Sequence, residues 1–258
     1  MSKICIKTKL IPLAKIKMKT NHINYDFEKS LWRLDEILNA SNDEFKEVDY
    51  IPNIDAFTFK NWYYIKCTVL FVDIRDSSSL PKTHKRPAIS RIYKSFISEV
   101  VAILNWNDNC KEINIEWDCV WWVFKTPNKV DIDWVFSDSA RISSLIKILN
   151  CKLIKKNFET IKIWIWMDYW RALMIKGWYS WSWINDIVWV WDVVNNTSKL
   201  CWYWNKEDYD RELMISKTIY SNLNEHNKEL MKVNTYRWCY HSNLIIKEMD
   251  NWKNENCN

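Results

Sequence analysis

The stretch Tyr63–Ile74 (YYIKCTVLFVDI) decides how this chain is interpreted. Its β-branched, aromatic and other apolar side chains predict a central β-strand. Asp73 interrupts the apolar end of this strand, and burying a carboxylate without a partner costs several kcal/mol. We therefore expect Asp73 to face a partner such as Arg75 or a metal ion; an ordinary acid at a strand end is the alternative.

Outward from this strand, the apolar pattern predicts helices and a hairpin. After a loop bounded by Pro81 and Pro87, apolar residues between Ile89 and Leu104 recur on one helical face. Glu116–Asp118 predicts the tip of a hairpin. Further strands are expected at Lys111–Ile115, Val120–Phe124, Ile161–Met167, Arg171–Ile175 and Ile187–Val190, and further helices at Val135–Leu149 and Val193–Leu200. The order β-α-β-β-α-β with additional strands predicts an α+β fold of the ferredoxin-like, or palm, type.

The same pattern divides the chain into three parts. Residues 1–57 form an N-terminal extension with one helix near Tyr25–Leu38. Residues 58–245 hold the strands and helices of the main domain, and residues 246–258 form a C-terminal tail.

Charge and cysteine content narrow the class of protein. The net charge of +5 over 258 residues permits an anionic ligand but is too small for a nucleic-acid-binding stripe. No segment approaches the roughly 18 apolar residues of a membrane span, and the basic N-terminus lacks the core of a signal peptide. The 8 Cys contain no CxxC, so we expect reduced, mostly buried thiols and a cytoplasmic protein without nucleic-acid or direct membrane contact.

The glycine and tryptophan counts are abnormal. The chain has 1 Gly and 19 Trp, whereas average usage of about 7% predicts roughly 18 Gly. A UGA codon that the source organism reads as Gly, translated as Trp, would produce this exchange. Predicted turns support the idea, because they favour glycine and here carry Trp117, Trp164, Trp166, Trp170, Trp178, Trp181, Trp183, Trp202 and Trp204. Apolar positions fit genuine tryptophan at Trp121 or Trp122, at Trp189 and at Trp32.

Asp73 and Asp118 together indicate a candidate metal site, which neither residue indicates alone. Asp73 ends the central strand and Asp118 lies on the neighbouring hairpin tip, so their carboxylates should lie a few ångströms apart. Such a pair repels unless a divalent cation lies between its members. This arrangement is typical of two-metal phosphoryl transfer, although each acid alone also fits an ordinary turn.

Two polar segments accompany the acids. Arg75, Ser77 and Ser78 follow Asp73 before a predicted helix, where hydroxyl and backbone N–H groups can bind phosphate oxygens. Asn195 and Lys199 lie four residues apart and would share a helix face, from which they could orient a ribose and neutralise a phosphate. A solvated loop and a solvated helix face are the alternatives.

Four segments resemble the catalytic domain of class III nucleotidyl cyclases. With Gly at the abnormal positions, their order and spacing agree with that family over roughly residues 60–245, which identifies the main domain as a cyclase catalytic domain. The segments are Phe71–Arg75, Glu116–Val120, Ile163–Trp166 and Val190–Asn195.

The resemblance implies roles for single residues. Asp73 and Asp118 would bind two Mg²⁺ or Mn²⁺ ions, with the Ile74 carbonyl assisting. Asn195 would position the ribose, and Lys199 stands where most members have Arg, so the charge is kept without the bidentate fork. The family works as a head-to-tail homodimer, in which each site takes the two Asp from one chain and Asn195 and Lys199 from the other.

The positions that read the base differ from those of purine cyclases. Asn114 and Val188 stand where adenylate cyclases have Lys and an acid or Thr/Ser, and Val188 cannot accept a hydrogen bond from an exocyclic amine. The segments around Asp73, Asp118 and Lys199 look most like the Pycsar antiviral cyclases. The resemblance implies a uridylate or cytidylate cyclase whose product is sensed by a separate effector. An adenylate cyclase and a non-catalytic nucleotide-binding module are the alternatives.

Overall fold

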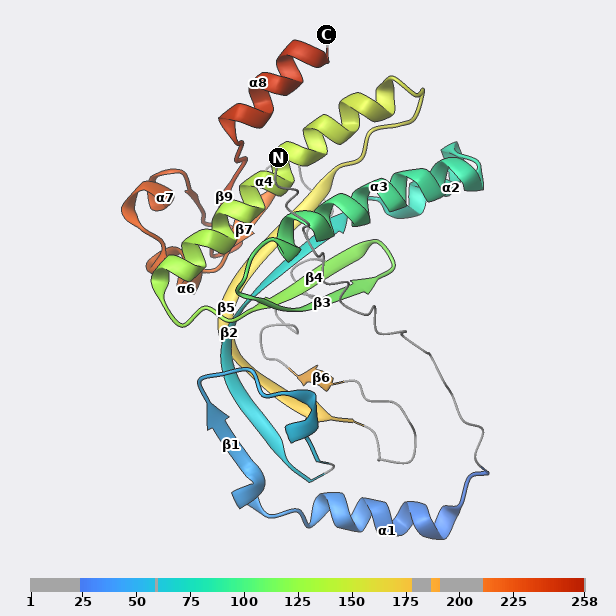
Figure 1. Cartoon of the computed structure of the whole chain (residues 1–258), viewed down its shortest axis with the longest axis vertical. Helices are drawn as coiled ribbons and strands as arrows, with labels where there is room; N and C mark the ends of the chain where they lie inside the picture. The colour runs from blue at the N-terminus through green and yellow to red at the C-terminus, as the bar shows by residue number, and fades with distance from the viewer. Residues whose placement is uncertain (1–23, 59, 178–186, 191–210, 258) are drawn as a thin grey trace, which may run out of the picture.

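The computed structural model describes residues 24–58, 60–177, 187–190 and 211–257. Its described strands form a mixed sheet in the order β3-β4-β2-β5-β7-β9-β8, while β1 pairs with β2 and β6 with β5 (Figure 1). The strands are β1 Phe45–Val48, β2 Trp62–Ile74, β3 Cys110–Glu116, β4 Cys119–Phe124, β5 Ile163–Lys176, β6 Ile187–Val190, β7 Leu213–Ile215, β8 Lys232–Asn234 and β9 Cys239–Ser242. The helices are α1 Phe27–Leu38, α2 Leu80–Thr83, α3 Arg86–Asn105, α4 Lys129–Ile154, α6 Lys217–Asn222, α7 Glu225–Glu229 and α8 Lys247–Asn256.

Helices α3 and α4 cover one face of the sheet (Figure 1). Successive residues of a strand point to opposite faces, and β2 follows this rule: Leu70, Val72 and Ile74 join the core beneath the helices. Val69 and Phe71 pack in clusters on the other face, which we call the open face of the sheet. By the same alternation, Asp73 belongs to the open face.

Strand β5 is continuous where the sequence predicted two strands and a turn. It pairs with β2 without interruption from Ile163 opposite Ile74 to Ile175 opposite Trp62. The unbroken hydrogen-bonding edge of β2 overrides the local turn signals. Trp164 and Trp166 are therefore buried strand residues, at 6% and 4% exposure, and their assignment to turns was wrong.

Two prolines mark helices rather than the ends of a loop. Pro81 lies in the first turn of α2 and Pro87 in the first turn of α3, where the missing N–H group costs nothing. The expected loop between them is thus reduced to His84 and Lys85, which separate α2 from α3.

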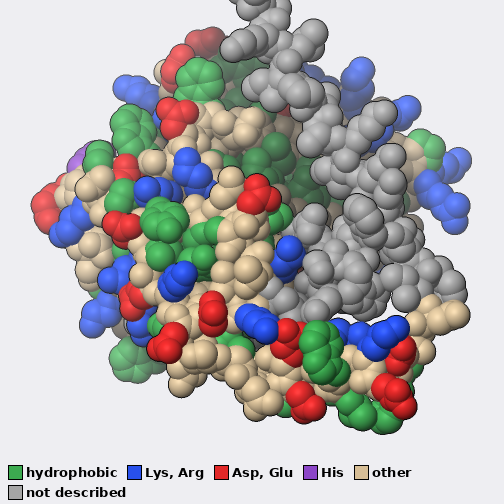
Figure 2. All heavy atoms as spheres, turned by 60° about the horizontal axis from the view of Figure 1, so that its bottom comes forward, with side chains coloured by type: hydrophobic (Ala, Val, Ile, Leu, Met, Phe, Trp, Pro, Cys, Tyr) green, Lys and Arg blue, Asp and Glu red, His purple; other side chains and the backbone are tan. Residues whose placement is uncertain are grey.

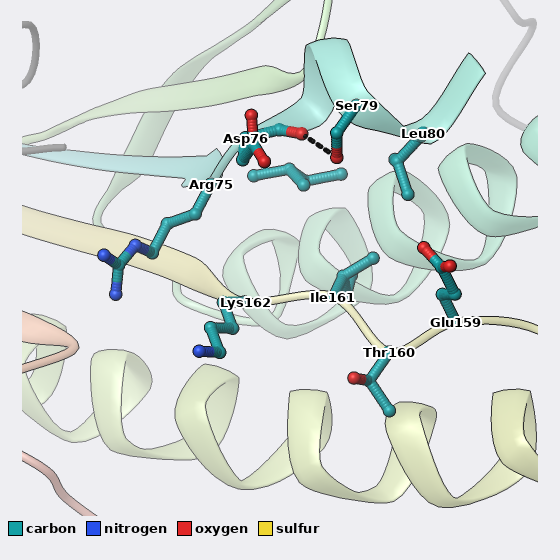
Figure 3. Close-up of a pocket in the computed structure, with 9 residues that line it drawn as sticks. Arg75, Asp76, Ser79, Leu80, Glu159, Thr160, Ile161 and Lys162 are labelled. Atoms are coloured by element: carbon teal, nitrogen blue, oxygen red, sulfur yellow. Dashed lines mark hydrogen bonds between the residues drawn. The ribbon is translucent and has the colours of Figure 1, made fainter. Parts of the chain in front are cut away.

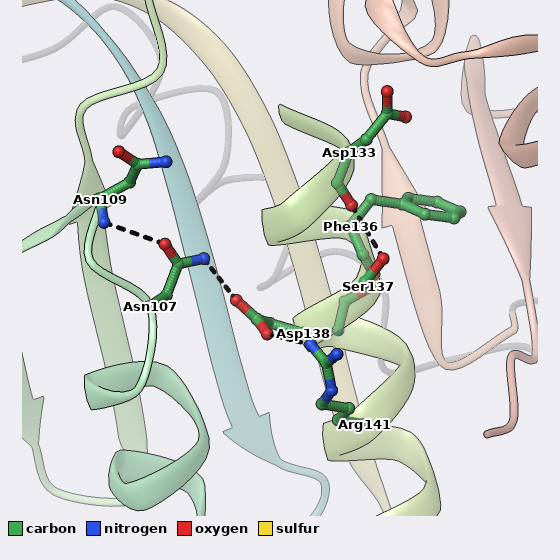
Figure 4. Close-up of polar contacts among 8 residues, drawn as sticks. Asn107, Asn109, Asp133, Phe136, Ser137, Asp138 and Arg141 are labelled. Atoms are coloured by element: carbon green, nitrogen blue, oxygen red, sulfur yellow. Dashed lines mark hydrogen bonds and ion pairs between the residues drawn. The ribbon is translucent and has the colours of Figure 1, made fainter. Parts of the chain in front are cut away.

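A polar network joins α4 to the loop between α3 and β3 (Figure 4). The buried carboxylate of Asp138 accepts from Asn107 Nδ2 and from Arg141 NH1, both at 2.6 Å. Burial raises the pKa of Asp138, while these two donors oppose that shift. The network places β3 at a fixed position along α4.

Within the predicted C-terminal tail, residues Lys247–Asn256 form the helix α8, which docks on α4. Helix α8 contacts α4 through Lys152, whose ammonium lies 5.2 Å from the ring centroid of Trp252. Cys151 and Cys257 form a disulfide, with 5.7 Å between their Cα atoms. This corrects the expectation of reduced thiols for these two residues, whereas Cys67 and Cys110 are free thiols.

The N-terminal extension contains the expected helix, α1. None of its residues is buried, so several apolar side chains such as Phe27, Leu31 and Leu34 face solvent. In Figure 2, which brings the α1 end of the molecule forward, charged side chains of both signs lie among hydrophobic ones. In the part of the chain that the structure describes, every helix is too short or too polar to cross a bilayer.

Candidate active site

The two predicted acids meet at one end of the sheet. Asp73 on β2 is in register with Cys119 on β4, and the Ile74 N–H donates to the Asp118 carbonyl oxygen at 3.3 Å. The β3–β4 hairpin therefore carries Asp118 to the end of β2, and its side chain reaches hydrogen-bonding range of the Asp73 carboxyl. Spacing in the sequence predicted this juxtaposition.

This neighbourhood changes the acidity of Asp73. Burial disfavours its charged form, and the nearby charge of Asp118 adds to the effect, so the pKa of Asp73 rises from 3.8 to about 7. Two adjacent carboxylates, both on half-buried residues, form a site where a proton or a cation is strongly favoured.

The residues present fit a divalent cation. Oδ1 of Asp73 is buried and has no hydrogen-bond partner in the structure, so one ligand oxygen is available. Oxygen ligands suit Mg²⁺ and Mn²⁺, and Mg²⁺ is commonly held by one or two carboxylates together with substrate phosphates. Among the described residues no group of three or more His, Cys, Asp or Glu is suited to a metal ion, so this pair is the candidate.

A pocket of about 540 Å³ lies at the end of β2, where the chain continues beyond Asp73 (Figure 3). Ile74 and Arg75, which follow Asp73, line it together with Lys162. The Arg75 N–H donates to the Lys162 carbonyl oxygen at 2.8 Å, which joins the end of β2 to the start of β5. The pocket thus offers two cationic side chains to phosphate oxygens, together with two acids of its own, Asp76 and Glu159. The remaining lining residues are Asp76, Ser79, Leu80, Glu159, Thr160 and Ile161.

Sequence reasoning missed Lys162. It lies at the boundary of a predicted strand, where a lysine is ordinary, and only the pairing of β5 with β2 brings it next to Arg75. The guanidinium of Arg75 lies 4.0 Å from the ring centroid of Trp164.

The serines after Asp73 face different directions. Ser77 hydrogen-bonds with the Tyr93 side chain, Ser78 is exposed, and neither is among the residues that line this pocket, so their contacts with phosphate stay predictions. Ser79 lines it instead, and its hydroxyl donates to the Asp76 carbonyl oxygen at 2.7 Å. The short 3-10 turn at Ser77–Ser79 causes this difference, since it rotates successive side chains to different sides.

Tyr93 is a further residue that the sequence did not indicate. Its position on the apolar face of α3 predicted a core residue. Burial raises the pKa of its hydroxyl, and the charges of Asp118 and Asp73 act in the same direction. The phenol therefore lies near the acid pair.

Asn114 and Val188 are the two positions predicted to read the base. Hydrogen bonds through Glu112 link Asn114 to Trp189, the neighbour of Val188. Asn114 Nδ2 donates to Glu112 Oε1 at 3.0 Å, and Trp189 Nε1 donates to Glu112 Oε2 at 2.9 Å. Val188, the neighbour of Trp189 on β6, is partly exposed. The predictions for Asn195 and Lys199 fall outside the described residues.

The fold places the domain in a known structural class. It is similar to the guanylyl cyclase Cya2, with a TM-score of 0.54, 13% identity and coverage of 66% of this chain and 82% of that chain. It is equally similar to the adenylyl cyclase CyaB from P. aeruginosa, with a TM-score of 0.54, 18% identity and coverage of 67% and 85%. The fold is that of a class III nucleotidyl cyclase domain.

Sequence relatives define the family more narrowly, although no protein-family model matches the chain. A uridylate cyclase of Gulbenkiania mobilis is 36% identical over 262 residues, covering 93% of this chain and all of the relative. A uridylate cyclase of Treponema porcinum is 34% identical over 237 residues, covering 90% of this chain and 82% of the relative. The chain belongs to the uridylate cyclase family.

Proposed function

We propose that this chain converts a pyrimidine nucleoside triphosphate, UTP or CTP, to the 3′,5′-cyclic monophosphate and pyrophosphate. The carboxylate pair of Asp73 and Asp118, beside a pocket with Arg75 and Lys162, is the observation that carries the proposal. The relatives named uridylate cyclase support the choice of a pyrimidine.

Some residues of the chain would bind the metal ions, and others would bind and orient the substrate. Asp73, Asp118 and the Ile74 carbonyl would hold two Mg²⁺ or Mn²⁺ ions. Bound there, the ions would supply charge neutralisation and would lower the pKa of the ribose 3′-hydroxyl. Arg75 and Lys162 would hold the leaving pyrophosphate, so that the 3′-oxygen attacks the α-phosphorus in line. Most of the catalysis would come from positioning and electrostatic stabilisation.

The remaining groups would come from a second copy of the chain. In a head-to-tail homodimer, Asn195 of the other copy would orient the ribose and Lys199 would neutralise phosphate charge. Asp73 lies on the face of the sheet opposite the helices α3 and α4, and a second copy of the chain would approach the site from that side. A protomer alone would then be inactive.

The resemblance to Pycsar cyclases also implies a role for the product in the cell. The cyclic nucleotide would act as an antiviral second messenger and would bind a separate effector protein. Cyclic UMP and cyclic CMP, measured before and after phage infection of cells carrying the gene, should rise only after infection. An unchanged level would exclude this role.

The enzymatic proposal is tested by incubation with Mn²⁺ and each of the four nucleoside triphosphates, followed by chromatography of the products. We expect cyclic UMP or cyclic CMP from the wild type, and a loss of at least a hundredfold in Asp73→Ala and Asp118→Ala. Asp55→Ala, which changes an exposed acid in a 3-10 turn, is the matched control and should retain activity. The protein should carry the residues that its own codons specify at the tryptophan positions.

The other outcomes identify the rivals. Cyclic AMP as the main product would indicate an adenylate cyclase with atypical base contacts. Nucleotide binding without any product would indicate a non-catalytic module. Full activity of either Asp variant would refute the assignment of the metal ligands.

A further inference from the structure

The carboxylate of Glu112 joins two parts of the sheet that are far apart along the strands. One oxygen accepts from Asn114 Nδ2 on the same strand, β3, and the other accepts from the indole of Trp189 on β6. Strands β2 and β5 are long and bent, which brings β6 back towards β3 (Figure 1). Glu112 is thus held from two directions.

Asn114 lies on the same face of the sheet as Asp73. It is in register with Trp121 on β4, whose ring stacks on Phe71 with centroids 5.6 Å apart. Directly opposed residues share a face, and Phe71 and Asp73 are two residues apart on β2. The Asn114 amide therefore belongs to the open face, where the proposed dimer would place a nucleotide.

The contact with Glu112 fixes the orientation of the Asn114 side-chain amide. An ionised carboxylate only accepts hydrogen bonds, so the amide nitrogen must face Glu112. The amide oxygen then points away from Glu112 as an acceptor. Without the carboxylate, the two orientations of the amide would differ little in energy and would interconvert.

A fixed amide distinguishes uracil from cytosine. Uracil offers a donor at N3 and an acceptor at O4, whereas cytosine offers an acceptor at N3 and a donor at N4. To pair with the same edge, an amide must turn its oxygen towards N3 of uracil but its nitrogen towards N3 of cytosine. Val188 has no hydrogen-bonding side chain, so among the two base-reading positions only Asn114 can make this distinction.

From these contacts we infer that Glu112 is a positioning residue, which fixes the Asn114 amide and makes the enzyme select UTP over CTP. The inference rests on the proposed function, because it takes Asn114 as facing the base. Glu112 acts through Asn114 and does not itself contact the substrate.

The test compares kcat/KM for UTP and for CTP in the wild type and in Glu112→Gln. The Trp189 indole can only donate, so it holds the glutamine oxygen, and the glutamine nitrogen then turns the Asn114 amide oxygen towards residue 112. The wild type should prefer UTP, and the UTP-to-CTP ratio should fall about tenfold or more in the variant. Glu99→Gln makes the same change at an exposed position of α3 and should keep the ratio. A wild type that prefers CTP, or an unchanged ratio in Glu112→Gln, overturns the inference.

The same substitution in the Asn114→Leu variant shows whether Glu112 positions Asn114 or has only a structural effect. Asn114→Leu should also lower the ratio, and Glu112→Gln should then change it no further, because residues that act as one unit are not additive. A further fall in the double variant overturns the inference. If Glu112→Gln does not fold, the Asn114→Leu variant alone is the test. A UTP-to-CTP ratio equal to that of the wild type in this variant also overturns the inference. These outcomes all require a wild type that cyclises a pyrimidine nucleotide; failure of the wild type itself instead refutes the proposed function.

Discussion

At the scale of single residues, Asp73 shows how a stable fold can include an unfavourable charge. Its carboxyl is half-buried, has one oxygen without a hydrogen-bond partner and lies next to the Asp118 carboxyl. Each of these conditions penalises the ionised form. The folded chain therefore gains free energy when a proton or a cation binds at Asp73.

This gain predicts the pH dependence of stability. The pKa of Asp73 is about 7 in the folded chain against an ordinary 3.8, so between these values the folded state binds more protons than the unfolded state. The free energy of unfolding should then fall as the pH rises through this window, in the absence of metal ions. Asp73→Asn removes the charge and should raise the free energy of unfolding at pH 8 by about 2 kcal/mol.

Urea unfolding at pH 5 and pH 8, with and without Mn²⁺, measures these effects. Mn²⁺ should stabilise the wild type more at pH 8, where it competes with fewer protons, and should have little effect on Asp73→Asn. An identical change of stability with pH in the wild type and the variant would contradict the account.

The sequence predicted part of the site at this scale. Asp73 and Asp118 were found because each follows a recognisable strand and the hairpin is local. Lys162 and Tyr93 were missed, since their roles depend on strand pairing and helix packing between segments that are distant in the chain. Ser77 and Ser78 were predicted to bind phosphate from their place before a helix, and this stays a prediction; the sequence does not reveal how a 3-10 turn directs their side chains.

At the scale of elements, the β3–β4 hairpin carries an unsuitable residue at its tip. Trp117 has a φ of 58° and is 92% exposed, and Trp238, between β8 and β9, has a φ of 55° and is 90% exposed. A positive φ is strained for a bulky side chain but costs glycine nothing. Both turns support the hypothesis that these letters stand for glycine.

This hypothesis makes a prediction for the hairpin. Trp117→Gly should stabilise the protein as written by about 1 kcal/mol, because the left-handed conformation is no longer strained. Thermal unfolding of the two proteins measures the difference, with Trp122→Gly as the opposite control, since that buried ring fills the core. The coding DNA should carry UGA at codon 117, and UGG there would disprove the recoding.

The elements that periodicity predicted well are those with one-sided burial. The apolar face of α3 and the β3–β4 hairpin lie where the pattern placed them. The continuous strand β5 was divided incorrectly, because Trp164, Trp166 and Trp170 were interpreted as turn residues. Pairing with β2, which the sequence does not display, keeps this segment extended.

At the scale of the whole molecule, the proposed active site is shared between two chains. If the acid pair and Asn195 act from different protomers, Asp73→Ala and Asn195→Ala are each inactive alone but complement one another. A mixed dimer then has one intact site, so equal mixing should restore roughly a quarter of wild-type activity. Cyclic nucleotide production after refolding the two variants together measures this recovery. No recovery, in a sample that sedimentation shows to be dimeric, would contradict a shared site.

The positive φ at residue 117 favours glycine there, and a UGA codon for that glycine would affect expression of the gene in other hosts. In a host with the standard genetic code, UGA ends translation, so a ribosome that meets it at this codon releases a truncated polypeptide. That fragment would retain Asp73 and lack Asp118, and it would also lack β4, the strand between β3 and β2. A synthetic gene with glycine codons would let such a host make the complete enzyme.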